Sequence, residues 1–247
     1  MAIRNSKVSK SCSTTRVLTL GNRTGDVSFA ECEADIDKIL EGNRNVVFEI
    51  VKGITLAQAM AERRTQREFS QQAVSLNIVQ RLLWAAYGVS EDAGKRTSPS
   101  AHALHPLRLY TCVGRIEGVE PGVYAIAPNA RDMNLHIDHD VRADLERVAL
   151  EDQPWIGNAA GIITICADMV AATSAFADQP PYGTRGQRYV HIEAGAAAQN
   201  IYLQTAAEGL ACVLVAGIQD EATAGVLNLA APVAPVLHMC FGWPETN

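Results

Sequence analysis

The chain has 247 residues, which suffices for one large domain or two small ones with a well-buried core. Its composition is ordinary for a globular protein, and its formal net charge of -6 argues against a nucleic-acid partner, because nucleic-acid-binding proteins usually carry a basic face. No apolar run approaches the roughly 20 residues that span a bilayer, so we expect no membrane partner. The six cysteines show no CxxC pair and no metal-type spacing, which favours reduced thiols in a cytoplasmic protein without a metal site.

The first fifty or so residues carry the weakest pattern. Residues 30–40 are expected to form a short helix and residues 46–51 a strand, which turns at Lys52 and Gly53. The beginning of the chain is basic and rich in Ser and Thr, but it lacks the long apolar core of a secretory signal. We therefore interpret residues 1–52 as an N-terminal arm or small cap, and residues 53–247 as the main domain.

An amphipathic helix is expected to begin at Leu56. Its apolar positions include Ala59 and Met60, at the spacing of one helix face. Thr55 and Gln58 fit a capping box, in which each side chain binds the other's backbone N–H. The sequence predicts that this helix continues into a basic cluster.

That cluster places three arginines and one hydroxyl within five residues: Arg63, Arg64, Thr65 and Arg67. Arginine offers a planar fork of donors that matches phosphate oxygens, so the cluster can bind a phosphate. On spacing alone, a solvated basic helix end that complements the helix dipole is the favoured interpretation.

The elements that follow mix helices and strands without a regular βαβ alternation. Helical stripes and stop signals predict helices at residues 76–87, 138–150, 188–208 and 220–229. Short apolar runs predict strands at residues 107–113, 123–126, 133–137, 160–167, 211–215 and 236–241. Because the GxGxxG and P-loop patterns are also absent, the sequence favours an α+β fold over a doubly wound one.

Two loops and one helix stand out. Residues 98–106 combine small residues, two hydroxyls and the imidazoles of His102 and His105, which suits contact with a flat ligand. Residues 168–186 are long for a loop without a function, which predicts a lid or substrate loop. The helix at residues 188–208 is rich in Ala, which fits either a buried helix or a seam between subunits. In both cases Gln199 and Asn200 need hydrogen-bond partners if they are buried.

Four pieces of the chain resemble a known family. Residues 63–69 (Arg-Arg-Thr-Gln-Arg-Glu-Phe) resemble its motif Arg-Arg-Ser-x-Arg-x-Phe. The other pieces are residues 82–88 with 96–101, residues 182–189 with 193–195 and 199–200, and residues 209–210 with 216–217. In this order they resemble the nitroreductase-like flavoproteins, and specifically the SagB-type oxidase/dehydrogenase branch. The resemblance leaves the residues before Leu56 uncovered.

The resemblance implies an FMN-binding α+β fold, with a mixed or antiparallel sheet flanked by helices, and an obligate homodimer with FMN at its interface. It implies that the FMN phosphate, ribityl chain and pyrimidine edge are held by Arg63, Arg64, Thr65 and Arg67. It also implies that the partner subunit lines the isoalloxazine with Pro99, Ser100 and Ala101, near Ala103 and His105. Ala216 and Gly217 are then expected to place a backbone N–H near flavin N5.

The chain departs from the family pattern in three places. Ala103 and His105 stand where many members have Asn and Gln, which alters two polar contacts to the flavin. Pro181 replaces the lysine of the Lys-Tyr pair used by azoline-oxidising members, whereas Tyr182 is present. Proline cannot act as a general base, which puts azoline oxidation in doubt. Tyr182 and His105 are the expected catalytic residues, with His102 as another candidate base, and a hydrogen-bonded loop residue is an equal interpretation of either histidine.

The resemblance therefore implies an FMN-dependent oxidoreductase that transfers hydride through flavin N5 in a ping-pong cycle. NAD(P)H is a candidate electron donor, and the substrate is a small organic molecule or a modified peptide. One alternative is a non-catalytic member of the fold that binds flavin or acts as a scaffold. A plain structural α+β domain is a third interpretation, in which the cluster at residues 63–67 is only a solvated helix end.

Overall fold

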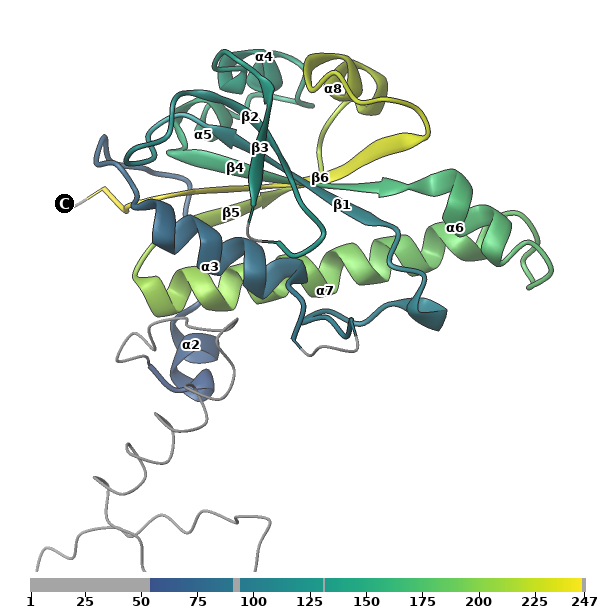
Figure 1. The fold of residues 1–247 in the computed structure, drawn as a ribbon. Coiled ribbons are helices and arrows are strands. Elements are labelled where there is room, and N and C mark those ends of the chain that lie inside the picture. The colour runs from purple at the N-terminus through teal and green to yellow at the C-terminus, as the bar shows by residue number, and fades with distance from the viewer. Residues whose placement is uncertain (1–53, 91–93, 131, 246–247) are drawn as a thin grey trace, which may run out of the picture. The chain divides into compact units, whose positions relative to one another are not determined.

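The computed structural model describes residues 54–90, 94–130 and 132–245 (Figure 1). The described residues form a six-stranded sheet in the order β3-β2-β1-β4-β6-β5, and every neighbouring pair is antiparallel. The strands are β1 Leu107–Val113, β2 Gly122–Ile126, β3 Met133–Ile137, β4 Gly161–Asp168, β5 Ala211–Val215 and β6 Val233–Gly242. The helix expected at residues 30–40 and the strand expected at residues 46–51 lie outside the described residues.

Helices cover both faces of this sheet. On one face lie α3 (Leu76–Tyr87) and α7 (Arg185–Glu208), and on the other lie α4 (Arg142–Arg147), α5 (Trp155–Asn158) and α8 (Asp220–Val226) (Figure 1). The remaining helices are α2 (Leu56–Glu62), α6 (Met169–Ala175) and the short 3₁₀ helix η1 (Ala101–Ala103). The predicted α+β class, with an antiparallel sheet between helices, is confirmed.

The central strand β4 separates two apolar cores. Ile162 and Ile163 are consecutive, point to opposite faces and are both 0% exposed. Ile163 belongs to the core under α3 and α7, whereas Ile162 belongs to the core under α4 and α5. A strand covered on both faces reads as a continuous apolar run, which is why its position could be predicted from the sequence.

The four cysteines among the described residues, Cys112, Cys166, Cys212 and Cys240, are buried in strands and unpaired. Burial raises the pKa of each thiol, so these groups are inert apolar residues, as expected. Within residues 54–90, 94–130 and 132–245, no helix is long and apolar enough to cross a membrane.

Two predicted segments are wrong in their extent. The helix expected at residues 138–150 is confined to α4, because the Asp140 carboxylate binds the backbone and guanidinium of Arg142 before the helix begins. The long loop expected at residues 168–186 contains α6 in its first half. Asp168 begins that helix by accepting the Ala171 N–H at 2.8 Å.

The helix at Leu56 begins as predicted and ends earlier. The Thr55–Gln58 capping box is present in both directions. The helix stops at Glu62, because Arg63 takes φ -50° and ψ 121°, outside the helical region. The arginine cluster is therefore an extended segment and not the basic end of a helix.

Candidate functional site

The extended segment of residues 63–67, here called the arginine strip, lies along the outer edge of β5. The Gln66 N–H donates to the Cys212 carbonyl at 2.9 Å. Just beyond the strip, the Ser70 N–H donates to the Trp243 carbonyl at 2.9 Å. Because β5 ends the sheet order, its outer edge is free to receive the strip.

Tyr202 on α7 joins the strip to this edge. Its hydroxyl accepts the Leu214 N–H at 2.8 Å and lies 3.3 Å from Thr65 Oγ1. Its ring lies under Arg63, whose Cζ is 5.2 Å from the ring centroid. Tyr202 therefore fixes Arg63 and Thr65 relative to the sheet. A tyrosine on a helix of small residues was the only sign of this role in the sequence.

The guanidinium groups of the strip keep donors for a ligand. Arg64 Nη1 donates to the carbonyls of Ala61 and Arg63, and Arg67 Cζ lies 5.0 Å from the centroid of the Trp155 ring. No ion pair joins Arg63, Arg64 or Arg67 to a carboxylate within the described residues. An aromatic ring under a guanidinium group holds that group in place without occupying the guanidinium N–H donors. These donors can therefore bind an anion.

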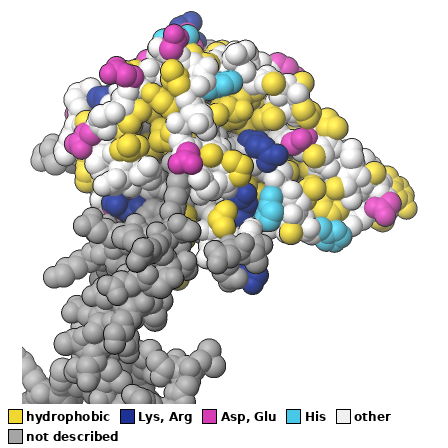
Figure 2. All heavy atoms as spheres, viewed as in Figure 1, with side chains coloured by type: hydrophobic (Ala, Val, Ile, Leu, Met, Phe, Trp, Pro, Cys, Tyr) yellow, Lys and Arg dark blue, Asp and Glu magenta, His cyan; other side chains and the backbone are white. Residues whose placement is uncertain are grey.

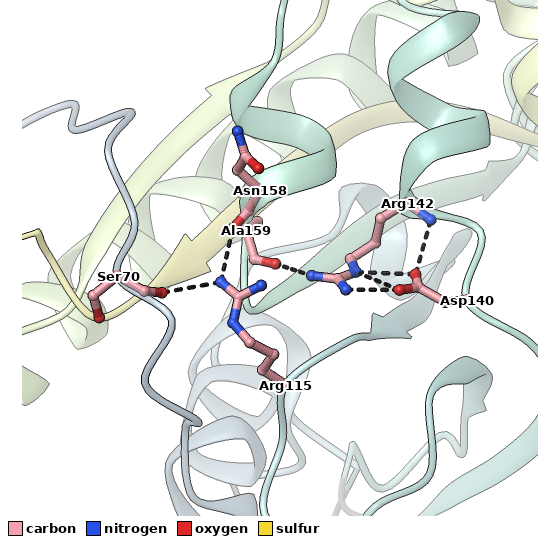
Figure 3. Close-up of polar contacts among 6 residues, drawn as sticks. All are labelled: Ser70, Arg115, Asp140, Arg142, Asn158 and Ala159. Carbon is pink, nitrogen blue, oxygen red and sulfur yellow. Dashed lines mark hydrogen bonds and ion pairs between the residues drawn. The ribbon is translucent and has the colours of Figure 1, made fainter.

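A second arginine pair holds the surroundings of the strip in place (Figure 3). Arg115 Nη2 donates to the carbonyls of Ser70 at 3.0 Å and Asn158 at 2.8 Å. Arg142 binds the Asp140 carboxylate and also donates to the Ala159 carbonyl. Burial alone would raise the pKa of Asp140, but the hydrogen bonds from Arg142 outweigh it and lower that pKa. Arg115 thus ties Ser70, just beyond the strip, to the end of α5, the helix that carries Trp155.

Ala216 and Gly217 lie where β5 ends. The Gly217 carbonyl accepts from the Leu150 N–H at 2.8 Å and from Gln153 Nε2 at 2.9 Å. Gln153 precedes Trp155 by two residues, so the turn after β5 and the Arg67–Trp155 contact share one segment. Within the part of the chain that the structure describes, the Gly217 N–H donates to no protein acceptor. The strip and this turn are thus brought together at one edge of the sheet.

The loop of residues 98–106 contacts a different part of α7. Glu193 Oε1 accepts the Ala101 N–H at 2.7 Å. The half-buried Asn200 donates through Nδ2 to the Thr97 carbonyl at 3.2 Å and to Ser98 Oγ at 3.1 Å, whereas Gln199 is exposed. Glu193 and Asn200 are seven residues apart, about two helical turns, and therefore hold the loop from one face of α7.

The loop stores backbone strain. His102, Ala103 and His105 have φ values of 50°, 54° and 52°, in the left-handed region that non-glycine residues rarely occupy. Each such residue costs about 1–2 kcal/mol. The bond from the His105 N–H to Ser100 Oγ, at 2.8 Å, helps to offset this cost. Strain of this kind concentrates at functional sites, which agrees with the expected role of the loop.

His105 packs against Tyr87, with 3.3 Å between its Nδ1 and the tyrosine hydroxyl. Burial, and secondarily the charge of Arg96, lowers the pKa of His105. Burial raises the pKa of Tyr87 to about 12. The pair is therefore a neutral imidazole and a neutral phenol at pH 7, and His105 can accept or pass a proton only through a hydrogen bond.

Glu193 is a functional candidate that the sequence reasoning missed. Its side chain is buried, with 4% exposed, and its second oxygen, Oε2, has no partner among the described residues. Burial raises its pKa. The sequence signal that could have indicated Glu193 is a single acidic residue within an alanine-rich stretch of the helix. Burying a carboxylate without a hydrogen-bond partner costs free energy, so such a residue points to a specific contact.

Within one chain the predicted site residues form separate groups. Glu193, next to the loop, and Tyr202, next to the strip, are nine residues apart on α7, or about 13 Å along its axis. Tyr182 is 72% exposed and precedes α7, whose first residue lies about 25 Å along the helix from Tyr202. Among the described residues no cluster of His, Cys, Asp or Glu could hold a metal ion.

Comparison with known sequences gives a consistent result. The sequence model of the nitroreductase family matches residues 60–243. The provisionally named nitroreductase MJ1384 of Methanocaldococcus jannaschii is 35% identical over 179 residues, which are 72% of this chain and 87% of that protein.

Solved structures show the same fold. A provisionally assigned nitroreductase from Ralstonia eutropha JMP134 aligns with a TM-score of 0.68 and 25% identity, over 82% of this chain and 89% of that chain. The NADPH:FMN oxidoreductase of Vibrio harveyi, solved in complex with NAD⁺, aligns with a TM-score of 0.54 and 17% identity, over 78% of this chain and 70% of that chain.

Proposed function

Because the chain belongs to the nitroreductase family, we propose that it is an FMN-dependent oxidoreductase. The observation that carries this proposal is the arginine strip, which is held on the edge of β5 and forms no ion pair with a carboxylate of the described residues. The strip lies within the family match, three residues after its start at residue 60, and a solved neighbour of the same fold is an FMN oxidoreductase. A plain structural domain has no need for three guanidinium groups at one sheet edge that form no ion pair within the described residues.

The donor set of this edge fits the proposed cofactor. Arg63 and Arg67 offer charged donors for a phosphate, and Thr65 offers a hydroxyl for the ribityl chain. The Gly217 N–H, with no protein acceptor among the described residues, is available to the ring system. Flavin, when bound, supplies hydride transfer at its N5 atom. The chain's part is to bind the phosphate, orient the ring and exclude water.

We also propose that the complete site needs two copies of the chain. Glu193, which holds Ala101, and Tyr202, which holds the strip, lie about 13 Å apart along α7 of one chain, so we propose that Pro99, Ser100 and Ala101 serve the strip of a partner. Exposed apolar side chains support association: Leu56 is 63% exposed, Met60 57% and Ile192 60%. All three lie on α2 and α7, the helices that carry or contact the site.

The proposed reaction passes hydride from NAD(P)H to a small organic or modified-peptide acceptor, with donor and acceptor using the same site in turn. His105 and the exposed His102 are the proposed proton-transfer residues, and Tyr182 is proposed to border the substrate. We also propose that the chain belongs to the SagB-type branch of the family. In that case the flavin would take hydride from a substrate, which is the reverse of substrate reduction. Pro181 argues against azoline oxidation, because the base expected beside Tyr182 is missing.

Subunit mixing tests the proposed site. Arg63→Ala/Arg67→Ala disables the strip, and Ala101→Trp blocks the loop that serves the partner. Each variant alone is expected to lose NAD(P)H oxidation, and an exchanged mixture is expected to recover up to about one quarter of it, because a heterodimer keeps one intact site. A mixture as inactive as its parents would reject the shared site, and full activity of the double arginine variant would reject the strip.

A non-catalytic flavin-binding or scaffold protein is the second candidate. Ala103, His105 and Pro181, where polar or basic residues are common in the family, favour it. This candidate predicts that FMN binds and resists reduction by both NADH and NADPH.

A further inference from the structure

A cavity of about 310 Å³ is lined by His105, by residues of β1 and by the segment that follows β2. It opens where the beginning of β1 extends past the end of β2, since β2 pairs with β1 only from Tyr110 onward. Its size is at the lower end of the range for small-molecule sites, which is about 300–1,000 Å³. No residue of the arginine strip lines it, and of the residues proposed above for the reaction only His105 does.

The lining combines an apolar body with two cations. Leu107, Leu109 and Ile126 contribute apolar walls, and Arg96 and Arg108 contribute guanidinium groups. Among the described residues that line the cavity, none is Asp or Glu. Figure 2 shows basic and histidine side chains close together among apolar ones, over the region where Figure 1 places β1 and the end of α3.

Both guanidinium groups are fixed before any ligand arrives. Arg96 Nη1 donates to the carbonyls of Tyr87 and Pro128, at 2.7 Å each, and its Cζ lies 4.5 Å from the centroid of the Tyr87 ring. Arg108 Nη1 donates to the carbonyls of His105 at 3.1 Å and Leu107 at 2.8 Å. Because each side chain is already held through one nitrogen, ligand binding needs to order it less, and the entropic cost of binding is smaller.

The same anchoring leaves donors unused. Arg96 Nε is buried and has no partner among the described residues. Arg108 makes no ion pair in that part of the chain, and its Nε and Nη2 form no hydrogen bond there. A buried donor without an acceptor costs about 1–3 kcal/mol, and an anion in the cavity would relieve that cost.

We propose that this cavity binds a small organic carboxylate with an apolar body. A carboxylate is planar and accepts bidentate bonds from guanidinium groups, and the apolar walls exclude a fully hydrated ion. Arg108 supplies the exposed edge of the site, and Arg96 its buried end. The inference stands on the cavity alone and does not require that the protein be a flavin enzyme.

Calorimetric titration of the full chain tests this site, with benzoate as the probe and benzamide as its neutral isostere. Benzoate is expected to bind saturably, one per chain, and benzamide at least about tenfold more weakly, since hydrogen bonds to charged groups are the stronger ones. Inorganic phosphate is expected not to displace benzoate. Absence of saturable benzoate binding, equal binding of benzamide, or displacement by phosphate at equal concentration would each overturn the proposal.

Three variants locate the binding. Arg108→Gln is expected to weaken benzoate binding at least about tenfold, and Ala127→Phe, which fills the cavity without changing charge, is expected to abolish it. Arg147→Gln is the matched control, because Arg147 is exposed on α4 and pairs with Asp144. Unchanged binding in both Arg108→Gln and Ala127→Phe would place benzoate elsewhere. The titration is repeated on flavin-free protein, where loss of binding would assign benzoate to the flavin site and reject the cavity.

Discussion

The arginine strip and the loop of residues 98–106 both contact α7, yet the chain holds them by different means. The strip is largely exposed, and aromatic rings and backbone bonds position it while its charged donors stay free. The loop is held by the buried side chain of Glu193 and the half-buried side chain of Asn200, and it contains three strained residues. The strip therefore supplies charge for recognition, whereas the loop supplies shape. Mutations should separate these roles: variants of the strip should lose ligand affinity, and variants of the loop should lose folding stability.

The largest effect is expected in the strip. Arg63→Ala/Arg67→Ala removes two charged donors, each worth about 1.5–3 kcal/mol, so FMN affinity should fall by roughly 10²- to 10⁴-fold. The melting temperature of flavin-free protein should change little, because neither side chain forms an ion pair in the described part of the chain. Flavin fluorescence titration measures the affinity, with Arg147→Ala as the exposed control. Unchanged affinity would mean that the strip is a solvated segment.

The loop should respond in stability instead. Glu193→Ala leaves the Ala101 N–H without its acceptor, and a buried unpaired donor costs about 1–3 kcal/mol. Urea unfolding of flavin-free protein measures this cost. Glu193→Gln should recover most of it, because an amide oxygen can accept the same bond. Equal stability of the alanine variant and the natural chain would show that the loop does not depend on Glu193.

The glutamine variant also carries a pH signature. Because burial raises the pKa of Glu193 above its usual 4.5, the folded state binds this proton more tightly than the unfolded state. The folded natural chain therefore loses stability as pH rises from about 4.5 through the raised pKa. Glu193→Gln lacks this proton, so its stability relative to the natural chain should improve over the same range. A pH-independent difference in urea midpoints would contradict the raised pKa.

Tyr202→Phe tests the contact between the strip and β5. Loss of the hydroxyl removes the acceptor of the Leu214 N–H and the contact with Thr65, at a cost of about 1 kcal/mol. FMN affinity should fall together with stability, because Thr65 loses the hydroxyl that positions it. The phenylalanine ring still supports Arg63, so the loss of affinity should be partial. Thermal unfolding and flavin titration on the same samples measure both. A loss of stability with full affinity would separate Tyr202 from the binding site.

The smallest expected effect has the opposite sign. Ala103 is exposed and has φ 54°, so Ala103→Gly relieves strain while losing few contacts, and should stabilise the protein by about 0.5–1 kcal/mol. The urea midpoint measures the gain. A destabilised variant would mean that the methyl group packs in the assembled protein, as expected if a partner subunit covers the loop.

The sequence predicted the strands well because burial leaves a direct pattern. The predicted ranges for β1, β3 and β5 agree with the structure, as do the Thr55 capping box and the helix stop at Gly209, whose φ is 73°. Helix lengths were harder to predict, because a hydrogen bond between residues close in sequence can set where a helix begins regardless of the apolar periodicity. The Asp140–Arg142 pair delays α4, and the Asp168 cap begins α6 inside a presumed loop.

The candidate site was predicted in part. A motif located the arginines, but their extended backbone and the role of Tyr202 depend on packing against β5, which no local pattern encodes. Glu193 was visible as a residue but not as a buried acceptor, because its partner is 92 positions away. The cavity near His105 could not be predicted, since it depends on where β2 stops pairing with β1.

The central claim is that the strip holds a redox-active flavin. The most direct measurement is the visible absorption spectrum of the freshly purified protein, recorded anaerobically before and after addition of NADPH and then NADH. The account predicts flavin bands that bleach with at least one nucleotide and that are missing from Arg63→Ala/Arg67→Ala. A colourless protein that takes up no added FMN would contradict it.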